Sequence, residues 1–436
     1  MSTRIALAWL AVLGLTACTA EPAAPSATTT ATASATATLA PSGDVIYMRG
    51  DERLRDAVVI DADTGRVMRW IPWGPVSADG SLVFTAVSDS GRTTVRALQL
   101  GTGNALNEVV LDGIYDWGAQ GMRGDRVGLS PSASWMVLHE TGDPSSFVVL
   151  DALLNVRTRV QLAGNFQFVA IDDDGAALYL LETATGAGNG VYRLRRVDLR
   201  SKTLAPEAVV DRGTTDERVT GYPVRTITSR DAHRIYTLYY VPGGRAFVRA
   251  LTPTLGNSER IGLPLPPPFA DGEADLAWTF TPSPDRGTAY ALNALIGRIA
   301  AIDLDEMRVA RSATFLVSRA GDSPLDAIAR WFFPIAEAKS ELFASAVVSP
   351  DGRTLYATEK YGTAVLVIDT ATLTVRSRIA GQQLGHLGLS ADGRRLYAVR
   401  ADGRQLIRMD PVAGTVVGTL PLTLDFAGVI YRIASR

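Results

Sequence analysis

The sequence has only one cysteine, Cys18, among its 436 residues. A single cysteine excludes internal disulfides, so the folded part of the chain must be stabilised by packing and hydrogen bonds. Neither sign of charge is in excess, because 43 Lys and Arg stand against 45 Asp and Glu. This balance gives no electrostatic reason to expect a nucleic-acid partner. Beyond residue 17, no apolar run reaches the roughly 18 residues that a membrane-spanning helix requires.

Histidines and catalytic motifs are equally scarce. The three histidines, His139, His233 and His386, lack the i, i+2 and i, i+4 spacings that favour a zinc or copper centre. Phosphate-binding loops, nucleophile elbows and dinucleotide-binding glycine patterns do not occur in the required context. The acidic run 172–175 resembles a calcium loop, but we interpret it as a turn because no glutamate stands at the twelfth loop position. The sequence therefore predicts no metal, no cofactor and no catalytic residue.

Residues 1–17 have the features of a secretory signal. Arg4 supplies a positive charge, and the apolar stretch 5–15 is too short to span a bilayer. It leads into LTAC at 15–18, which resembles the lipobox of bacterial lipoproteins. The resemblance implies that the chain is cut before Cys18 and that this cysteine carries a diacylglyceryl group, which would hold the protein on the extracytoplasmic side of a bacterial cell membrane. The alternative is an ordinary secretory signal with a chance cysteine.

Residues 18–42 form a low-complexity segment of Thr, Ala, Ser and Pro. The segment has almost no large apolar side chains, so it cannot offset the entropy cost of becoming ordered. We expect it to be a disordered stalk that separates a folded domain, residues 43–436, from the membrane.

The folded part repeats one motif. The clearest copies are SPDGRTLYA at 349–357 and SADGRRLYA at 390–398. Degenerate copies begin near Ser42, Ser77, Ser130, Asp172, Ser229 and Ser283. Short apolar, β-branched runs separated by Asp- and Gly-containing turns follow each copy, as in VLVIDTATLTV at 365–375. Helical periodicity is nearly absent, so each copy predicts a unit of four short antiparallel strands.

These copies resemble the YVTN-type and WD-repeat-like β-propellers of bacterial surface proteins. The resemblance rests on the S-P-D-G-x-x-L-Y and I-D-x-x-T-x-x-V patterns and covers nearly all of 43–436. It implies an all-β fold, a single propeller of four-stranded antiparallel blades. The eight copies predict eight blades, with seven, the number usual in the family, as the alternative. The strand at 428–434 has no blade of its own, and we expect it to close the ring as the innermost strand of the first blade.

Length variation is concentrated in two kinds of connection, those after the second and those after the fourth strand of a blade. Antiparallel geometry places both kinds on the same rim of the ring. The long connections are Asp112–Asp125, Thr183–Gly190, Pro206–Tyr222, Gly256–Asp275 and Ser312–Ser345. Repeat proteins often carry function on the face that collects insertions. This rim is therefore the candidate binding face, with neutral drift of surface loops as the alternative.

Two of these insertions contain aromatic side chains suited to anchoring a partner. Tyr115 and Trp117 stand beside two carboxylates, whereas Trp331 and Phe332 lie in a segment that starts like a helix at 323–326. We select these four aromatic residues as the candidate binding-face residues. The alternative is that they pack onto the propeller.

The sequence favours a non-enzymatic binding scaffold that is anchored by lipid and holds a partner protein or an envelope glycan. The alternative is a propeller enzyme, either lactonase-like or similar to the quinone-cofactor dehydrogenases, with its site at the central channel. Lactonases of this shape use acidic, His and Arg residues around the channel, and none can be matched residue by residue in this sequence. His386 precedes the expected inner strand 387–389 and is the histidine expected nearest to the channel mouth.

Overall fold

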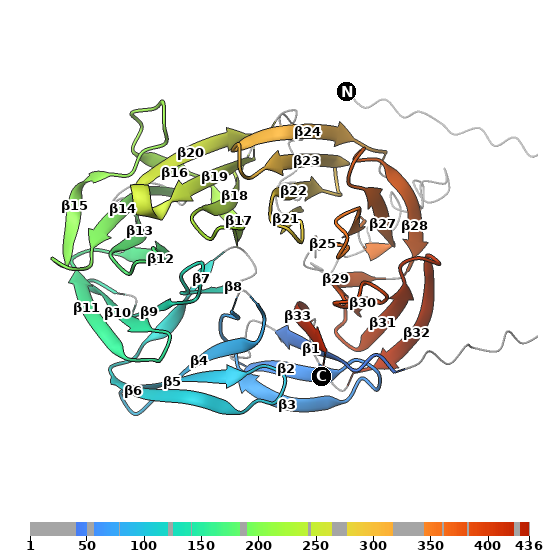
Figure 1. Ribbon diagram of the computed structural model, residues 1–436, viewed down its shortest axis with the longest axis horizontal. Coiled ribbons are helices and arrows are strands. Elements are labelled where there is room, and N and C mark those ends of the chain that lie inside the picture. Colours follow the sequence, from blue (N-terminus) through green and yellow to red (C-terminus); the bar gives the residue numbers. More distant parts are fainter. Residues whose placement is uncertain are drawn as a thin grey trace, which may run out of the picture. The chain divides into compact units, whose positions relative to one another are not determined.

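The computed structural model describes residues 41–49, 56–77, 79–120, 125–140, 142–183, 190–242, 246–263, 277–316, 344–359, 362–381, 383–422 and 428–435. These residues form eight antiparallel sheets that follow one another around a central channel (Figure 1). Across the described ranges, helix is limited to the 3-10 turn η1 (Pro253–Leu255). The predicted all-β propeller with eight blades is confirmed, and the seven-blade alternative is wrong.

The strands of each blade follow one another from the channel outward. Blade 1 contains β33 (Val429–Ser435), β1 (Asp44–Arg49), β2 (Asp56–Asp61) and β3 (Val67–Pro72), and blade 2 contains β4 (Leu82–Asp89), β5 (Arg92–Gln99) and β6 (Ala105–Asp112). Blade 3 contains β7 (Asp116–Gln120) with β8 (Asp125–Val127), then β9 (Trp135–Glu140), β10 (Ser145–Asp151) and β11 (Val156–Leu162). Blade 4 contains β12 (Phe166–Ile171), β13 (Ala177–Thr183), β14 (Val191–Asp198) and β15 (Thr203–Ala208), with β16 (Arg218–Thr220) beside β14. Blade 5 contains β17 (Tyr222–Thr228), β18 (Ile235–Tyr240), β19 (Phe247–Thr252) and β20 (Asn257–Gly262), and blade 6 contains β21 (Trp278–Pro282), β22 (Thr288–Asn293), β23 (Arg298–Asp303) and β24 (Arg308–Thr314). Blade 7 contains β25 (Ala346–Val348), β26 (Thr354–Thr358), β27 (Ala364–Asp369) and β28 (Val375–Ala380). Blade 8 contains β29 (Leu384–Leu389), β30 (Leu396–Arg400), β31 (Gln405–Asp410) and β32 (Thr415–Pro421).

Blades 2 and 3 depart from the regular pattern at the channel. In blade 2 the innermost strand is reduced to a bridge between Val76 and Val83. In blade 3 the β7–β8 hairpin interrupts the innermost strand, which then continues at Leu129, where it bridges to Met136.

The repeated S-P-D-G motif closes the turn between the first and second strand of a blade. In blade 7, the Ser349 hydroxyl donates to Asp351 Oδ1 at 2.6 Å and accepts from the backbone N–H of Thr354 at 2.9 Å. Gly352 adopts the left-handed conformation that the turn requires, with φ of 73°. The same serine-to-aspartate bond recurs at Ser77, Ser229, Ser283 and Ser390. We call the end of the ring that carries these turns the turn face, and the opposite end, where β24 ends and β25 begins, the insertion rim.

The tyrosine of the motif joins neighbouring blades. The buried Tyr236 hydroxyl of β18 donates to the carbonyl oxygen of Leu304 in blade 6, and Tyr179 of β13 donates to the carbonyl oxygen of Pro253 in blade 5. An aromatic ring at this position therefore fills the space between two blades, and its hydroxyl pairs a carbonyl group of the next blade.

We predict that Tyr236→Phe lowers the free energy of unfolding by about 1 kcal/mol, because the carbonyl of Leu304 loses its hydrogen-bond donor. Urea unfolding measures this change. Tyr222→Phe is the control, because the half-buried Tyr222 hydroxyl makes no hydrogen bond within the described part of the chain. Equal stability of Tyr236→Phe and the wild type would show that the bond between the blades contributes nothing.

The C-terminal strand closes the ring as predicted. β33 pairs antiparallel with β1 from Asp44 opposite Ser435 to Arg49 opposite Val429, so the two ends of the described chain share blade 1 (Figure 1). Ile430 of β33 is buried in the apolar cluster that joins blade 1 to blade 8. The closing strand therefore completes both a sheet and the packing between two blades.

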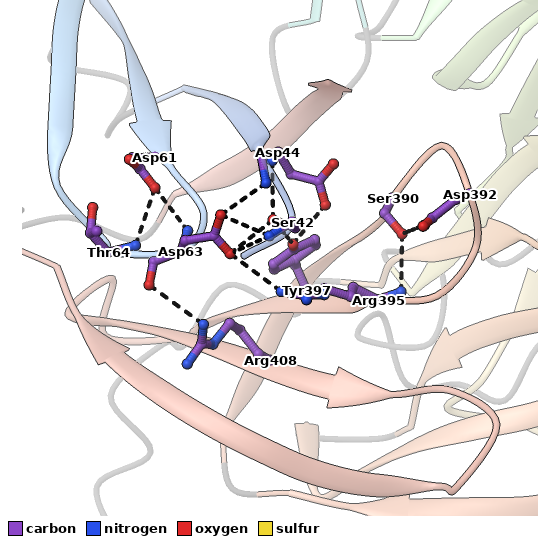
Figure 2. A network of polar contacts seen from close by, with 11 residues as sticks. Ser42, Asp44, Asp61, Asp63, Thr64, Ser390, Asp392, Arg395, Tyr397 and Arg408 are labelled. Atoms are coloured by element: carbon purple, nitrogen blue, oxygen red, sulfur yellow. Dashed lines mark hydrogen bonds and ion pairs between the residues drawn. The ribbon is translucent and has the colours of Figure 1, made fainter. Parts of the chain in front are cut away.

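A polar network lies at the same junction of blades 1 and 8, where the residues before β1 and the turn after β2 meet the first turn of blade 8 (Figure 2). The Asp63 carboxylate accepts hydrogen bonds from the backbone N–H groups of Ser42 at 2.8 Å and Gly43 at 2.9 Å. The Tyr397 hydroxyl of blade 8 donates to Asp44 Oδ2 at 2.7 Å. Burial raises the pKa of Asp44. The first residues of the ring are thus hydrogen-bonded to both blade 1 and blade 8. Residues 1–40, which include the predicted signal and most of the predicted stalk, lie outside the described residues.

Candidate binding site in the channel

The inner strands surround a cavity of about 370 Å³ in the central channel. Its lining comes from blades 1, 2, 3, 4, 5, 6 and 8 and extends to turn residues such as Ser77 and Ser130, so the cavity reaches the turn face. Much of the wall is apolar, with Val127, Leu129 and Val224 among the lining residues. A cavity of this size lies within the range of about 300–1,000 Å³ that is typical of small-molecule sites.

Three arginines supply the charge of this cavity. Arg225 comes from the middle of β17, Arg286 from the turn after β21, and Arg432 from the closing strand β33. Arg286 Nη1 donates to the Thr228 hydroxyl at 2.9 Å, and Arg432 Nη2 donates to the carbonyl oxygen of Asp79 at 3.0 Å. The described residues that line the cavity include no Asp or Glu. The lining as described is therefore positively charged.

The local backbone explains how two of these arginines reach the cavity. Arg286 occupies the turn position that is glycine at Gly352 and Gly393, and it adopts φ of 54°. A side chain in this left-handed conformation costs about 1 kcal/mol. A register shift in β17 between Pro223 and Arg225 indicates a bulge, a feature that redirects side chains. Sequence reasoning missed both arginines, although an Arg at the glycine position of the copy SPDR at 283–286 was a visible signal for Arg286.

The structure places the candidate aromatic residues differently from the sequence-based expectation. Tyr115 is 8% and Trp117 is 1% exposed, and both belong to the apolar cluster between blades 2 and 3. Their rings contribute to packing, and in this arrangement they form no accessible anchor. Trp331, Phe332, the expected helix at 323–342 and Cys18 lie outside the described residues.

The histidines are spread over the ring. His386 lines the channel cavity, as its place in the sequence suggested. His139 is buried and stacks on Phe147 with ring centroids 6.0 Å apart, and His233 lies in the first turn of blade 5. Among the described residues, no group of three or more His, Cys, Asp or Glu side chains is placed to hold a metal ion. None of the described helical residues forms a segment long and apolar enough to cross a membrane.

In the motif turns of blades 2, 5, 6, 7 and 8, the aspartate has a lowered pKa. Hydrogen bonds lower the pKa of Asp79 to about 2. The bond from the Ser77 hydroxyl has the largest effect, and those from the hydroxyl and the backbone N–H of Ser81 come next. In the corresponding turns, the hydroxyl of the motif serine is the largest cause of a lowered pKa at Asp231, Asp285, Asp351 and Asp392. These hydrogen bonds favour the charged form of each carboxylate in the folded ring.

We predict that the thermal midpoint falls as the pH is lowered from about 4 to about 2. An aspartate whose folded pKa is below its unfolded value of about 3.9 stabilises the fold above that value, and this contribution is lost as the pH falls through the folded pKa. Burial raises the pKa values of Asp44 and Asp172. These two residues favour folding at low pH, but the aspartates with lowered pKa values outnumber them. Calorimetric scans across this range measure the effect. Asp79→Asn should show a smaller fall than the wild type, and an unchanged or rising midpoint in the wild type would contradict the prediction.

Comparison with known proteins supports the fold. The sequence matches no protein-family model and no curated protein. The structure is similar to apo AztD from Citrobacter koseri, with a TM-score of 0.53 and 12% identity over 90% of this chain and 99% of that one. It is also similar to the dihydro-heme d1 dehydrogenase NirN in complex with DHE, with a TM-score of 0.52 and 16% identity over 90% of this chain and 74% of that one. At these identities the likeness shows the propeller fold alone.

Proposed function

We propose that this protein is a lipid-anchored, extracytoplasmic binding protein that holds a partner protein or an envelope glycan at the insertion rim of its propeller. The observation that carries the proposal is the placement of the long connections. Those from β15 to β17, from β20 to β21 and from β24 to β25 all start and end at this rim, whereas the turn face has short, hydrogen-bonded turns. A closed ring with variable segments on one face is a common way to present a binding surface.

The described part of one connection is built into the ring. Asp211, which follows β15, accepts from Arg249 Nε of β19 at 2.8 Å and from the Ser258 hydroxyl at 2.7 Å. The Arg249 side chain is only 7% exposed, so this ion pair is shielded from water. β16 then pairs with β14 and extends blade 4. This insertion is a formed surface with a fixed position, which argues against neutral drift of a loose loop.

The anchor is tested at Cys18. We expect the intact mass of the protein extracted from membranes to show the loss of residues 1–17 and the gain of a diacylglyceryl group. Cys18→Ser should remove the lipid and release the folded domain from the membrane fraction or leave the signal uncleaved. A lipid-free wild-type product that is cut at another position would contradict the anchor.

The binding rim is tested by its remaining candidate aromatics, Trp331 and Phe332, which lie in the connection from β24 to β25. Cross-linking in intact cells should trap the partner with the wild type and trap much less with Trp331→Ala/Phe332→Ala, because aromatic anchors tend to dominate interfaces. Leu153→Ala is the control, since Leu153 is 68% exposed in the turn between β10 and β11, on the turn face. Digestion of the adduct with a protease or a glycan hydrolase distinguishes a protein from a glycan. Equal trapping by all three proteins would contradict the proposed anchors.

A further inference from the structure

We propose that the channel cavity is a second site, separate from the insertion rim, and that it binds a small organic anion. Arg225 and Arg286 would pair with the carboxylate or phosphate group of this ligand, and the apolar wall would contact the rest of it. The ligand would enter from the turn face, where the cavity opens beside Ser77 and Thr228. The inference does not depend on the function proposed for the rim, because it rests on other residues, which line the channel.

The charge balance of the cavity is the first argument. Half-buried Arg225 has no hydrogen bond or ion pair within the described part of the chain. On the turn face, Asp79 is hydrogen-bonded to the hydroxyls of Ser77 and Ser81, and Asp285 to that of Ser283. Neither carboxylate forms an ion pair with Arg225. A half-buried cation without a counter-ion is unfavourable, and a bound anion would remove that cost.

The conformation of Arg286 is the second argument. The same turn position holds glycine in blades 7 and 8 and alanine, also at positive φ, in blades 3 and 5, whereas this copy holds a long cationic side chain at φ of 54°. The Thr228 hydroxyl accepts from one terminal nitrogen, Nη1, which fixes the guanidinium and leaves its other N–H groups for a ligand. A planar guanidinium suits the paired oxygens of a carboxylate or phosphate.

The surroundings define the size and class of the ligand. Arg432 donates to the carbonyl oxygen of Asp79, and a Cβ on Gly80 would lie 2.3 Å from Arg432 Nε, so this arginine is held tightly against the turn of blade 2 at the edge of the cavity. Deeper in the channel, Val127 and Val224 contribute apolar wall. The cavity of about 370 Å³ therefore suits a small anion with an apolar body better than a bare inorganic ion.

Titration calorimetry with the purified full chain tests the site. Phenyl phosphate and benzoate are the probes, inorganic phosphate tests for the anionic group alone, and benzamide is the uncharged analogue of benzoate. We expect a Kd at or below about 1 mM for phenyl phosphate or benzoate, weaker binding of inorganic phosphate, and no binding of benzamide. Arg225→Gln should weaken binding of the aromatic anions at least about tenfold, because a charge-assisted hydrogen bond is lost. Arg394→Gln is the matched control, since Arg394 lies on the turn face with its side chain 85% exposed.

Arg286→Gly separates binding from folding. Glycine restores the residue that the turn carries in blades 7 and 8, so the unfolding midpoint of this variant should stay equal to that of the wild type or rise. Binding of the aromatic anions should nevertheless weaken at least about tenfold. Two results would overturn the proposal: no binding of any anionic probe at about 10 mM, well above the expected Kd, or binding that Arg225→Gln and Arg286→Gly leave unchanged.

Discussion

Truncation of the chain after Gly428, which removes β33, is expected to prevent the formation of a stable ring. β33 supplies the whole innermost strand of blade 1, and its loss leaves β1 with an unpaired edge at the channel. Ile430 and Ile433 also leave the cluster that joins blade 1 to blade 8. Each buried side chain of this kind contributes about 1.5–3 kcal/mol, and the strand hydrogen bonds add to this. The total is comparable to the stability of a typical domain, about 5–15 kcal/mol.

Thermal unfolding followed by circular dichroism measures the effect of the truncation. We expect loss of the cooperative transition and binding of a hydrophobic dye at temperatures where the wild type is folded. Removal of Arg436 alone is the control, because β33 ends at Ser435, and this variant should melt like the wild type. If the chain that ends at Gly428 melted with the wild-type midpoint, β33 would not be the strand that closes the ring.

Gly74→Ala should be the most damaging single substitution that we predict, with a loss of at least about 3 kcal/mol in the free energy of unfolding. A Cβ at Gly74 would lie 1.7 Å from the carbonyl oxygen of Phe84 and 3.3 Å from Trp117 Nε1. The Phe84 carbonyl belongs to the backbone of β4, which is paired on its outer side with β5, so it cannot move away as a flexible side chain would. The clash must displace either the connection between blades 1 and 2 or β4 itself.

Urea unfolding of Gly74→Ala and of Gly101→Ala tests this argument. A Cβ at Gly101 would meet no atom within 4 Å, so the control should change stability by less than about 0.5 kcal/mol. Similar stabilities of the two variants would contradict the close approach of residue 74 to β4.

The architecture could be predicted from the sequence because its causes are local and repeated. Ser349, Asp351 and Gly352 each have one role in a single turn, so the same letters recur wherever the turn recurs. The closing strand was predictable because 428–434 formed a strand without a blade. Repeats reveal the features that every blade needs.

The burial of Tyr115 and Trp117 was not predictable in the same way. Tyr115 lies in the connection after β6 and Trp117 in the short strand β7, in a stretch whose sequence has no periodicity that shows which face a side chain occupies. In the structure they pack against Phe84 of blade 2 and Met136 and Leu138 of blade 3. Blade 2 has only a bridge at Val76 in place of its inner strand, and these aromatic rings fill the space between the two blades.

The arginines of the channel were also beyond the reach of the sequence. Arg225, Arg286 and Arg432 are far apart along the chain, and only the closing of the ring brings them to one cavity. Each belongs to a different blade, and arginine is abundant throughout the sequence. Of the three, only Arg286 lies at a position of the repeated motif, where the two clear copies have glycine.

The claim that the insertion rim binds a partner is tested most directly by replacing residues 319–341, within the connection from β24 to β25, with a short Gly-Ser linker. The connection joins strands of neighbouring blades, so we expect an unchanged unfolding midpoint together with loss of the adduct that cross-linking traps in intact cells. Arg394→Gln, on the turn face, should retain the adduct. Undiminished trapping by the shortened, folded protein would contradict the account.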